Sequence, residues 1–255
     1  MSAQVTRGSL VVVGIGPGDW SMCTPQAASA LQHAEWLYGY GPYLARVPRQ
    51  SHQTFVPSDN RVEAERAREA LEKAVAGHHV AMVSGGDPGV FAMASAVCEQ
   101  IEHGPTAWRA LHVRFLPGIT AMLAVASACG APLGHDFCAI SLSDNLKSWE
   151  TVERRLDAAA QGGFVMAFYN ACSRARPWQL GAAFDRLRTH LPGETVVIFG
   201  RAIGREDASL RTTTLAEASA HGVDMATLVM VGSRETRCIE REQQPALVYT
   251  PRYTR

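Results

Sequence analysis

The chain has 255 residues, 24 basic and 24 acidic, and 47% of it is hydrophobic. A formal net charge of zero does not attract a polyanion over a distance, so we expect no nucleic-acid partner. We find no signal peptide and no apolar segment near the roughly 20 residues that span a bilayer, which predicts a soluble, cytoplasmic protein with no membrane partner. The six cysteines form no C-x-x-C pair, so we expect no metal site.

Short apolar strands alternate with helical stretches in the first half of the chain. Thr24 and Pro25 have the order of an N-cap and a first helical residue, and Asn60 with Glu63 resembles a capping box. The pattern predicts strands at residues 10–15, 35–40, 79–84 and 111–116, and helices at 25–33, 62–75 and 91–102.

Pro117 and Gly118 mark a boundary, which predicts an N-terminal lobe at residues 1–116 and a C-terminal lobe at 117–255. The second half is expected to hold helices at 120–129, 150–160 and 177–191, and strands at 137–142, 162–169, 195–200, 226–232 and 246–251. This alternation predicts an α/β fold whose lobes each carry a mixed or largely parallel sheet flanked by helices. A cleft between two lobes is a usual place for a ligand.

The first strand runs into "GIGPGD", a glycine-rich turn that does not suit a phosphate. A dinucleotide-binding G-x-G-x-x-G motif would need glycine where this chain has Asp19, and Pro17 lacks the backbone N–H that such a loop offers. No Gly-Lys pair occurs, so a Walker motif is absent too. The turn suits a ligand that approaches the backbone closely and brings no phosphate.

Two further turns of similar composition follow later strands. "SGGDPGVF" spans Ser84–Phe91 and "LPGITA" spans Leu116–Ala121. The carboxyl ends of parallel strands share one edge of a sheet, where α/β proteins bind ligands. We therefore expect the three loops to lie together and to bind a ligand through Asp87 and loop carbonyls.

The ordered set G-x-G-P-G-D, G-D-P and P-G-I-T-A resembles the tetrapyrrole methylases, the class III S-adenosylmethionine-dependent methyltransferases. The resemblance covers nearly the whole chain. It implies the two-lobed tetrapyrrole methylase fold with S-adenosyl-L-methionine in the interlobe cleft, S-adenosyl-L-homocysteine as product, a small-molecule tetrapyrrole substrate and a homodimer.

The segments "GYGPYLARVP", "GDPGVFAMA", "GAPLGHDFCAISLSDNLKSWE", "RPWQLG" and "TLVMVG" narrow the resemblance to one branch of that family. The implied reaction is methylation of precorrin-3B at C17 with ring contraction to precorrin-4, in cobalamin biosynthesis. Three alternatives stay open: the same methylation of cobalt-factor III in the anaerobic pathway, methylation of RNA or of a protein, and a non-catalytic tetrapyrrole-binding protein.

The resemblance also implies which residues bind the cofactor. They lie in the three glycine loops and in three segments of the second lobe: Pro17, Gly85, Gly86, Asp87, Val90, Thr120, Ala121, Asn170, Ala171, Ala202 and Thr227. One departure is visible, because the family pattern leads us to expect "YNP" where this chain reads Tyr169-Asn170-Ala171.

Residues that bind or act on the substrate are predicted from their charge and from the proton transfer that ring contraction requires. Loop arginines are candidates to pair with the carboxylates of the macrocycle: Arg46, Arg49, Arg174, Arg176 and Arg201. Candidate catalytic residues are Asp144, Lys147, Tyr43 and His135, with Tyr40 and Asp136 beside them.

Overall fold

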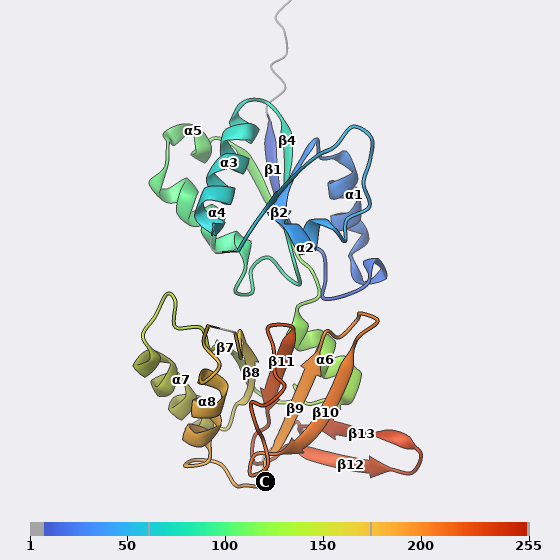
Figure 1. Cartoon of the computed structure of the whole chain (residues 1–255), viewed down its shortest axis with the longest axis vertical. Coiled ribbons are helices and arrows are strands. Elements are labelled where there is room, and N and C mark those ends of the chain that lie inside the picture. The colour runs from blue at the N-terminus through green and yellow to red at the C-terminus, as the bar shows by residue number, and fades with distance from the viewer. Residues whose placement is uncertain (1–7, 61, 174, 254–255) are drawn as a thin grey trace, which may run out of the picture. The chain divides into compact units, whose positions relative to one another are not determined.

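The computed structural model describes residues 8–60, 62–173 and 175–253, and divides into two compact units between Thr120 and Ala121 (Figure 1). The sequence predicts the boundary four residues earlier, after residue 116. Residues 117–120 stay with the first unit because the Gly118 N–H donates to the Asp87 carboxylate at 3.1 Å. Within the described residues, no helix has both the length and the apolar character of a membrane span.

A five-stranded sheet in which all pairs are parallel forms the centre of the first unit, in the order β3-β2-β4-β1-β5. Its inner strands are apolar on both faces, as expected of a parallel sheet covered on both sides. The strands are β1 (Ser9–Gly14), β2 (Trp36–Tyr40), β3 (Thr54–Ser58), β4 (His79–Ser84) and β5 (His112–Leu116).

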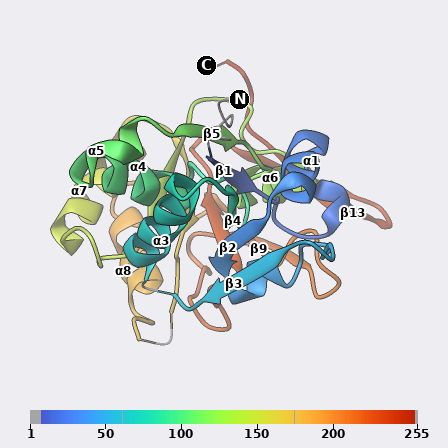
Figure 2. The same cartoon turned by 90° about the horizontal axis from the view of Figure 1, so that it is seen from above.

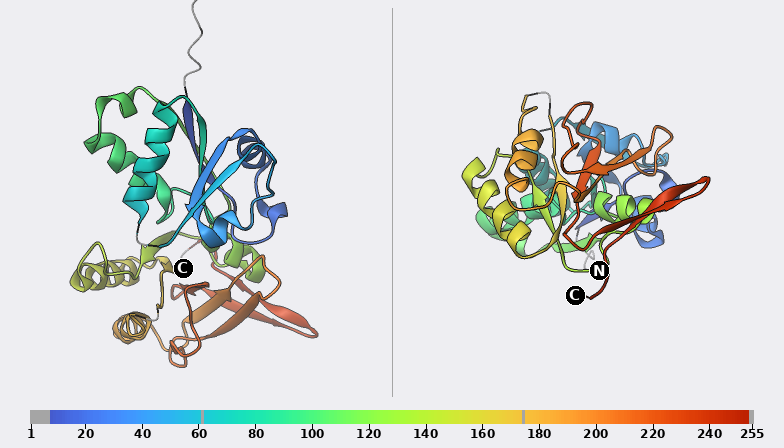
Figure 3. Two further views of the ribbon diagram at one scale, coloured as in Figure 1. Left: turned by 45° about the horizontal axis from the view of Figure 1, so that its top comes forward. Right: turned by 90° about the horizontal axis from the view of Figure 1, so that it is seen from below.

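Helices cover both faces of this sheet, as Figure 2 and the left view of Figure 3 show. One face packs against α3 (Glu63–Val75), α4 (Met93–His103) and α5 (Thr106–Arg109). The other packs against α1 (Pro25–His33) and α2 (Gly41–Leu44), near the short 3-10 helix η1 (Trp20–Met22). The predicted cap of α1 is confirmed, because Thr24 Oγ1 accepts from the Ala27 N–H at 3.2 Å.

Two predictions for this unit are wrong in detail. The N-cap of α3 is Val62, which makes no side-chain cap, so Asn60 is not part of a capping box. The next helix starts at Met93 rather than at residue 91, because Phe91 has a left-handed φ of 51° and Ala92 is extended. Strand β3 has no strong apolar alternation and was not predicted.

The second unit carries a five-stranded mixed sheet in the order β10-β9-β11-β8-β7, and a small sheet in the order β12-β13-β6. Strands β7 and β8 are parallel, whereas β11 runs antiparallel to β8 and β9. The strands are β6 (Gly130–Ala131), β7 (Phe137–Ser141), β8 (Val165–Tyr169), β9 (Val196–Arg201), β10 (Ser209–Thr214), β11 (Thr227–Val231), β12 (Arg237–Arg241) and β13 (Gln244–Tyr249).

Helix α6 (Ala121–Cys129) covers one face of the larger sheet, and α7 (Trp149–Gln161) with α8 (Gln179–Leu187) covers the other. The hairpin of β12 and β13 projects away from that sheet (Figure 3, right). The helix predicted at 177–191 is shorter, since residues 188–191 form turns. Strands β6, β10 and β12 were not predicted, being very short or largely polar. The predicted α/β class, with mixed or largely parallel sheets, is confirmed.

Candidate functional site

The three glycine loops meet at the carboxyl edge of the first sheet. Strand β1 lies between β4 and β5, and all three run parallel, so the turns that follow them are neighbours. Gly16 and Gly86 exchange backbone hydrogen bonds of 3.2 and 2.9 Å, which join the first loop to the second. The sequence spacing therefore predicted this arrangement correctly.

Asp87 joins the second loop to the third. Its Oδ1 accepts from the Gly89 N–H at 2.8 Å, and its Oδ2 accepts from the Gly118 N–H at 3.1 Å. Because an ionised carboxylate has about four acceptor positions, these two bonds leave capacity for a ligand hydroxyl. A Cβ on Gly14 would lie 2.6 Å from Gly86 O and 2.8 Å from the nitrogen of Gly118, so the loops pack backbone to backbone.

Arg46 holds the first loop. Its Nη2 donates to the carbonyl oxygens of Gly16 at 2.9 Å and Gly18 at 2.5 Å. Asp19 caps η1 by accepting from the Ser21 N–H at 2.8 Å, and hydrogen bonds from Ser21 hold the pKa of Asp19 below its usual value. Asp19 is therefore a capping residue of this loop.

Tyr43 lies against the second loop. A Cβ on Gly85 would come within 2.7 Å of the Tyr43 ring, so glycine at this position is what admits the aromatic side chain. The rings of Tyr40 and Tyr43 meet edge to face at 5.3 Å. Val90 closes the second loop in a turn onto Asp87, and Pro17 is half-buried in the first. Thus Tyr43 borders the loops predicted to bind the cofactor.

A second cluster of predicted residues gathers at one edge of the sheet in the other unit. Asn170 follows β8, Ala202 follows β9, and Thr227 begins the antiparallel strand β11 between them. Asn170 and Ala202 have left-handed φ values of 52° and 51°, which are unusual for residues other than glycine and often mark functional turns. The Asn170 amide donates to Ser141 Oγ at 2.9 Å, which ties β8 to β7.

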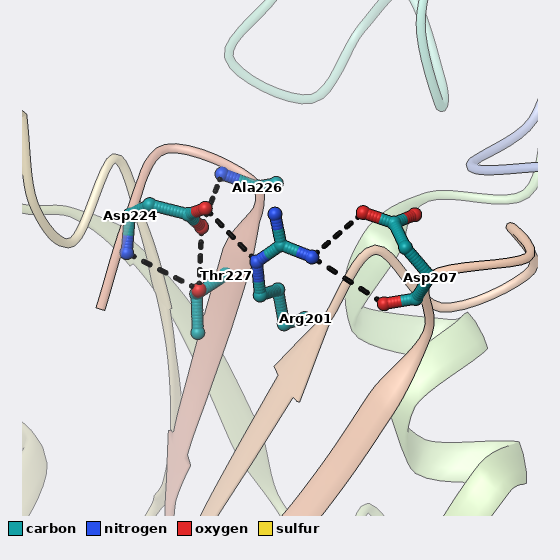
Figure 4. A network of polar contacts seen from close by, with 5 residues as sticks. All are labelled: Arg201, Asp207, Asp224, Ala226 and Thr227. Atoms are coloured by element: carbon teal, nitrogen blue, oxygen red, sulfur yellow. Dashed lines mark hydrogen bonds and ion pairs between the residues drawn. The ribbon is translucent and has the colours of Figure 1, made fainter. Parts of the chain in front are cut away.

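A network of polar contacts fixes the turn beside Thr227 (Figure 4). Arg201 donates to Asp224 at 2.9 Å and to Asp207 at 2.7 Å, and Thr227 Oγ1 donates to Asp224 at 2.8 Å. Burial raises the pKa of Asp224, but hydrogen bonds from Thr227, Arg201 and Ala226 outweigh it and leave that pKa below its usual value. A cavity of about 260 Å³ adjoins Arg201 and Thr227.

Four predicted cofactor residues are buried, namely Thr120, Ala171, Ala202 and Thr227. Ala171 is fully buried in the core of the second unit, with neither its side chain nor its backbone exposed. Thr120 is buried at the end of the first unit, and Ala121 begins α6 and packs on the core there.

The catalytic candidates of the second unit do not all lie together. Asp144 and Lys147 follow β7, whereas His135 precedes it, so the five-residue strand separates them by roughly 16 Å. Asp144 pairs with Arg176 at 3.0 Å, and Lys147 Nζ donates to Ser143 O at 2.7 Å. Burial, with the charge of Arg155 second, lowers the pKa of Lys147. His135 Nδ1 accepts from the Asp136 N–H at 2.7 Å, away from the predicted cofactor edge.

Four of the five candidate substrate arginines have partners within the protein. Arg49 stacks on Phe55 at 4.5 Å, while Arg46, Arg176 and Arg201 make the contacts above, and Arg174 lies outside the described residues. The sequence did not predict the acceptors of Arg201, because folding is what brings Asp224 and Asp207 into contact with it. In the described part of the chain, no group of three or more His, Cys, Asp or Glu side chains is arranged to hold a metal ion.

Comparison with known proteins gives consistent matches. Residues 9–219 match the family model "Tetrapyrrole (Corrin/Porphyrin) Methylases". The chain is 58% identical over 246 residues to a precorrin-3B C(17)-methyltransferase of Sinorhizobium sp, covering 96% of this chain and 97% of that protein. It is 41% identical to a probable cobalt-factor III C(17)-methyltransferase of Salmonella typhimurium, covering 95% and 98%. The crystal structure of the methyltransferase CobJ superposes with a TM-score of 0.90 at 47% identity, covering 96% and 100%.

Proposed function

The chain belongs to the tetrapyrrole methylase family, and from this premise we propose that it transfers a methyl group from S-adenosyl-L-methionine to C17 of precorrin-3B. Ring contraction to precorrin-4 accompanies the transfer, and the reaction belongs to cobalamin biosynthesis. The 58% identity to the Sinorhizobium enzyme over nearly the full length of both chains is the observation that carries this proposal.

The loops of the first unit fit a cofactor that has a sulfonium and hydroxyls but no phosphate. Pro17 offers no N–H, and Arg46 already engages the carbonyls of Gly16 and Gly18. Asp87 keeps acceptor capacity that suits the hydroxyls of a ribose. In the second unit, the left-handed turns at Asn170 and Ala202 would approach the cofactor with their backbones.

The cofactor supplies an electrophilic methyl group on a good leaving group, so the protein contributes mainly position. The contacts among Gly14, Gly16, Gly86, Asp87 and Gly118 make the first-unit edge rigid, which fixes a bound ligand without further reorganisation. Such rigid placement of reacting groups lowers the activation barrier because the entropy of alignment has been lost in folding and binding.

Ring contraction also needs a proton to move, and we propose Tyr43 and Lys147 as the two candidates for it. Tyr43 lies against Gly85, and its phenol can donate or accept a proton. Lys147 lies beyond the carboxyl end of β7, and burial lowers its pKa, which favours the neutral amine that a general base needs. His135 is the weakest candidate, since it lies at the opposite end of β7.

The cobalt-bound substrate is the second candidate, because the Salmonella relative is named for cobalt-factor III. The test is a parallel assay of precorrin-3B and cobalt-factor III with methyl-labelled S-adenosyl-L-methionine. Faster label incorporation into precorrin-3B is expected. Preference for the cobalt-bound macrocycle would assign the anaerobic reaction instead.

A non-catalytic tetrapyrrole-binding protein is the alternative of another class. Titration calorimetry with S-adenosyl-L-methionine separates the two, since heat of binding is expected only for the methyltransferase. We further propose a cytoplasmic homodimer, and light scattering of the purified chain tests the dimer by giving twice the 27.5 kDa mass of one copy.

A further inference from the structure

Two loops of the second unit are joined at the carboxyl ends of β7 and β8. Leu142 N donates to Tyr169 O at 2.9 Å, and the Asn170 amide donates to Ser141 Oγ at 2.9 Å. Farther out, Arg176 Nη1 donates to Asp144 Oδ1 at 3.0 Å and also contacts Asn145 Oδ1. The loop of residues 142–148 is therefore held to the segment that carries Arg176.

This joined pair of loops displays apolar side chains to solvent. Trp178 is 47% exposed and Leu146 is fully exposed. Trp178 is also rigid, because its ring packs edge to face on Trp149 at 4.7 Å. Trp149 in turn donates its indole N–H to Glu153 at 3.1 Å and packs against the core. A rigid indole with an exposed surface binds an apolar ligand at little cost in conformational entropy.

The position of this surface relates it to the proposed substrate. The segments that carry Leu146 and Trp178 follow the parallel strands β7 and β8, and Asn170, one of the proposed cofactor residues, joins the ends of these two strands through Ser141. Lys147 and Arg155 add positive charge to the same region. The proposed substrate is a large apolar macrocycle with carboxylates at its edge. Its apolar face can pack on the exposed indole of Trp178, and its carboxylates can pair with nearby cations.

We propose that Trp178 and Leu146 form a contact surface for one face of the tetrapyrrole macrocycle, and that Asp144 and Arg176 are a positioning pair that holds this surface. The proposal rests on the proposed function, because it takes the substrate class from there. It also gives Asp144 a role other than proton transfer, since its carboxylate is engaged with Arg176.

The first test measures tetrapyrrole binding and turnover for Trp178→Ala, Trp178→Phe and Leu146→Ser. Trp178→Ala is expected to raise the Kd and KM for the macrocycle roughly tenfold, with kcat and the Kd for S-adenosyl-L-methionine unchanged. Trp178→Phe should recover most of the affinity. Leu146→Ser removes a fully exposed side chain and so tests the surface without disturbing packing; a smaller rise in the same two constants is expected.

Trp36→Ala is the matched control, because Trp36 is a partly exposed tryptophan at the amino end of β2 in the first unit. Its KM for the macrocycle should stay at the wild-type value. Unchanged macrocycle Kd in both Trp178→Ala and Leu146→Ser would overturn the proposed surface. Failure of the proposed function would give a different result, because wild-type protein would then transfer no label. The Kd measurements do not require turnover, so they test the surface independently of the reaction.

The second test concerns the positioning pair. Asp144→Asn should raise KM for the macrocycle while leaving the pH profile of kcat unchanged, and exchanging the two charges (Asp144→Arg with Arg176→Asp) should restore part of the lost affinity. Loss of one limb of the kcat pH profile in Asp144→Asn would show that Asp144 moves a proton, and would overturn the positioning role.

Discussion

Substituting Gly14 by Ala tests whether backbone packing among the three glycine loops builds the cofactor edge. The added Cβ would lie 2.6 Å from Gly86 O, 2.8 Å from the nitrogen of Gly118 and 2.8 Å from Pro88 Cδ. Two of these contacts are with backbone atoms, so no flexible side chain can give way. The loops must separate by a few tenths of an ångström.

The expected loss of stability follows from these contacts. Overpacking a tight site costs about 1–3 kcal/mol. Separation of the loops also weakens the hydrogen bonds between Gly16 and Gly86 and between Gly118 and Asp87, each worth about 1 kcal/mol. We expect Gly14→Ala to destabilise the first unit by about 3 kcal/mol and to weaken binding of S-adenosyl-L-methionine at least tenfold.

Titration calorimetry measures the affinity for S-adenosyl-L-methionine, and urea unfolding measures the stability. Hydrogen exchange of the β1 amides reports on the unfolding of the first unit. Gly181→Ala is the matched control, because Gly181 lies within α8 and a Cβ there meets no atom within 4 Å. That variant should gain up to about 1 kcal/mol from helix propensity. Wild-type stability and cofactor affinity in Gly14→Ala would refute the reasoning.

Three further predictions concern single side chains. Asp87→Asn should lower S-adenosyl-L-methionine affinity roughly tenfold in calorimetry, because its amide would turn a donor toward the N–H of Gly118 or Gly89; unchanged affinity would contradict this. Cys98 is exposed, whereas burial raises the pKa of Cys138 to about 11, so mass spectrometry at pH 8 should find iodoacetamide on Cys98 well before Cys138. Hydrogen bonding to Arg186 holds the pKa of Asp157 below its usual value, so its stabilisation is present above the unfolded-state pKa of about 3.9 and is lost as the pH falls through the folded-state value. The urea midpoints of wild type and Asp157→Asn should therefore differ at pH 6 and approach each other as the pH falls below about 4, and a constant gap would count against this linkage.

Local signals in the sequence predicted most of the architecture of the first unit. Thr24 and Pro25 fix the start of α1, and the apolar run of β4 gives its bounds without error. The loop edge was also predictable, since parallel strands bring their carboxyl ends together whatever the details of packing. Polar strands such as β10 were missed, because their pairing partner, β9, defines them and their own alternation is weak.

The side-chain partners at the candidate site depend on contacts between segments far apart in the chain. Arg46 and Arg201 are candidates to pair with substrate carboxylates, and the fold gives each a partner far away in the sequence: Gly16 lies 30 residues from Arg46, and Asp224 lies 23 residues from Arg201. The separation of His135 from Asp144, by contrast, follows from the strand that the sequence predicts at residues 137–142. Charge type is readable from sequence, whereas the acceptor that a given arginine finds is a property of the fold.

The central claim is methyl transfer to C17 of precorrin-3B, and one measurement tests it most directly. Purified protein is incubated with precorrin-3B and S-adenosyl-L-methionine carrying a ¹³C-methyl group, and the product is analysed by mass spectrometry and NMR. The account predicts one labelled methyl group, located at C17 of a contracted macrocycle. A macrocycle without label, or label at another carbon, would contradict it.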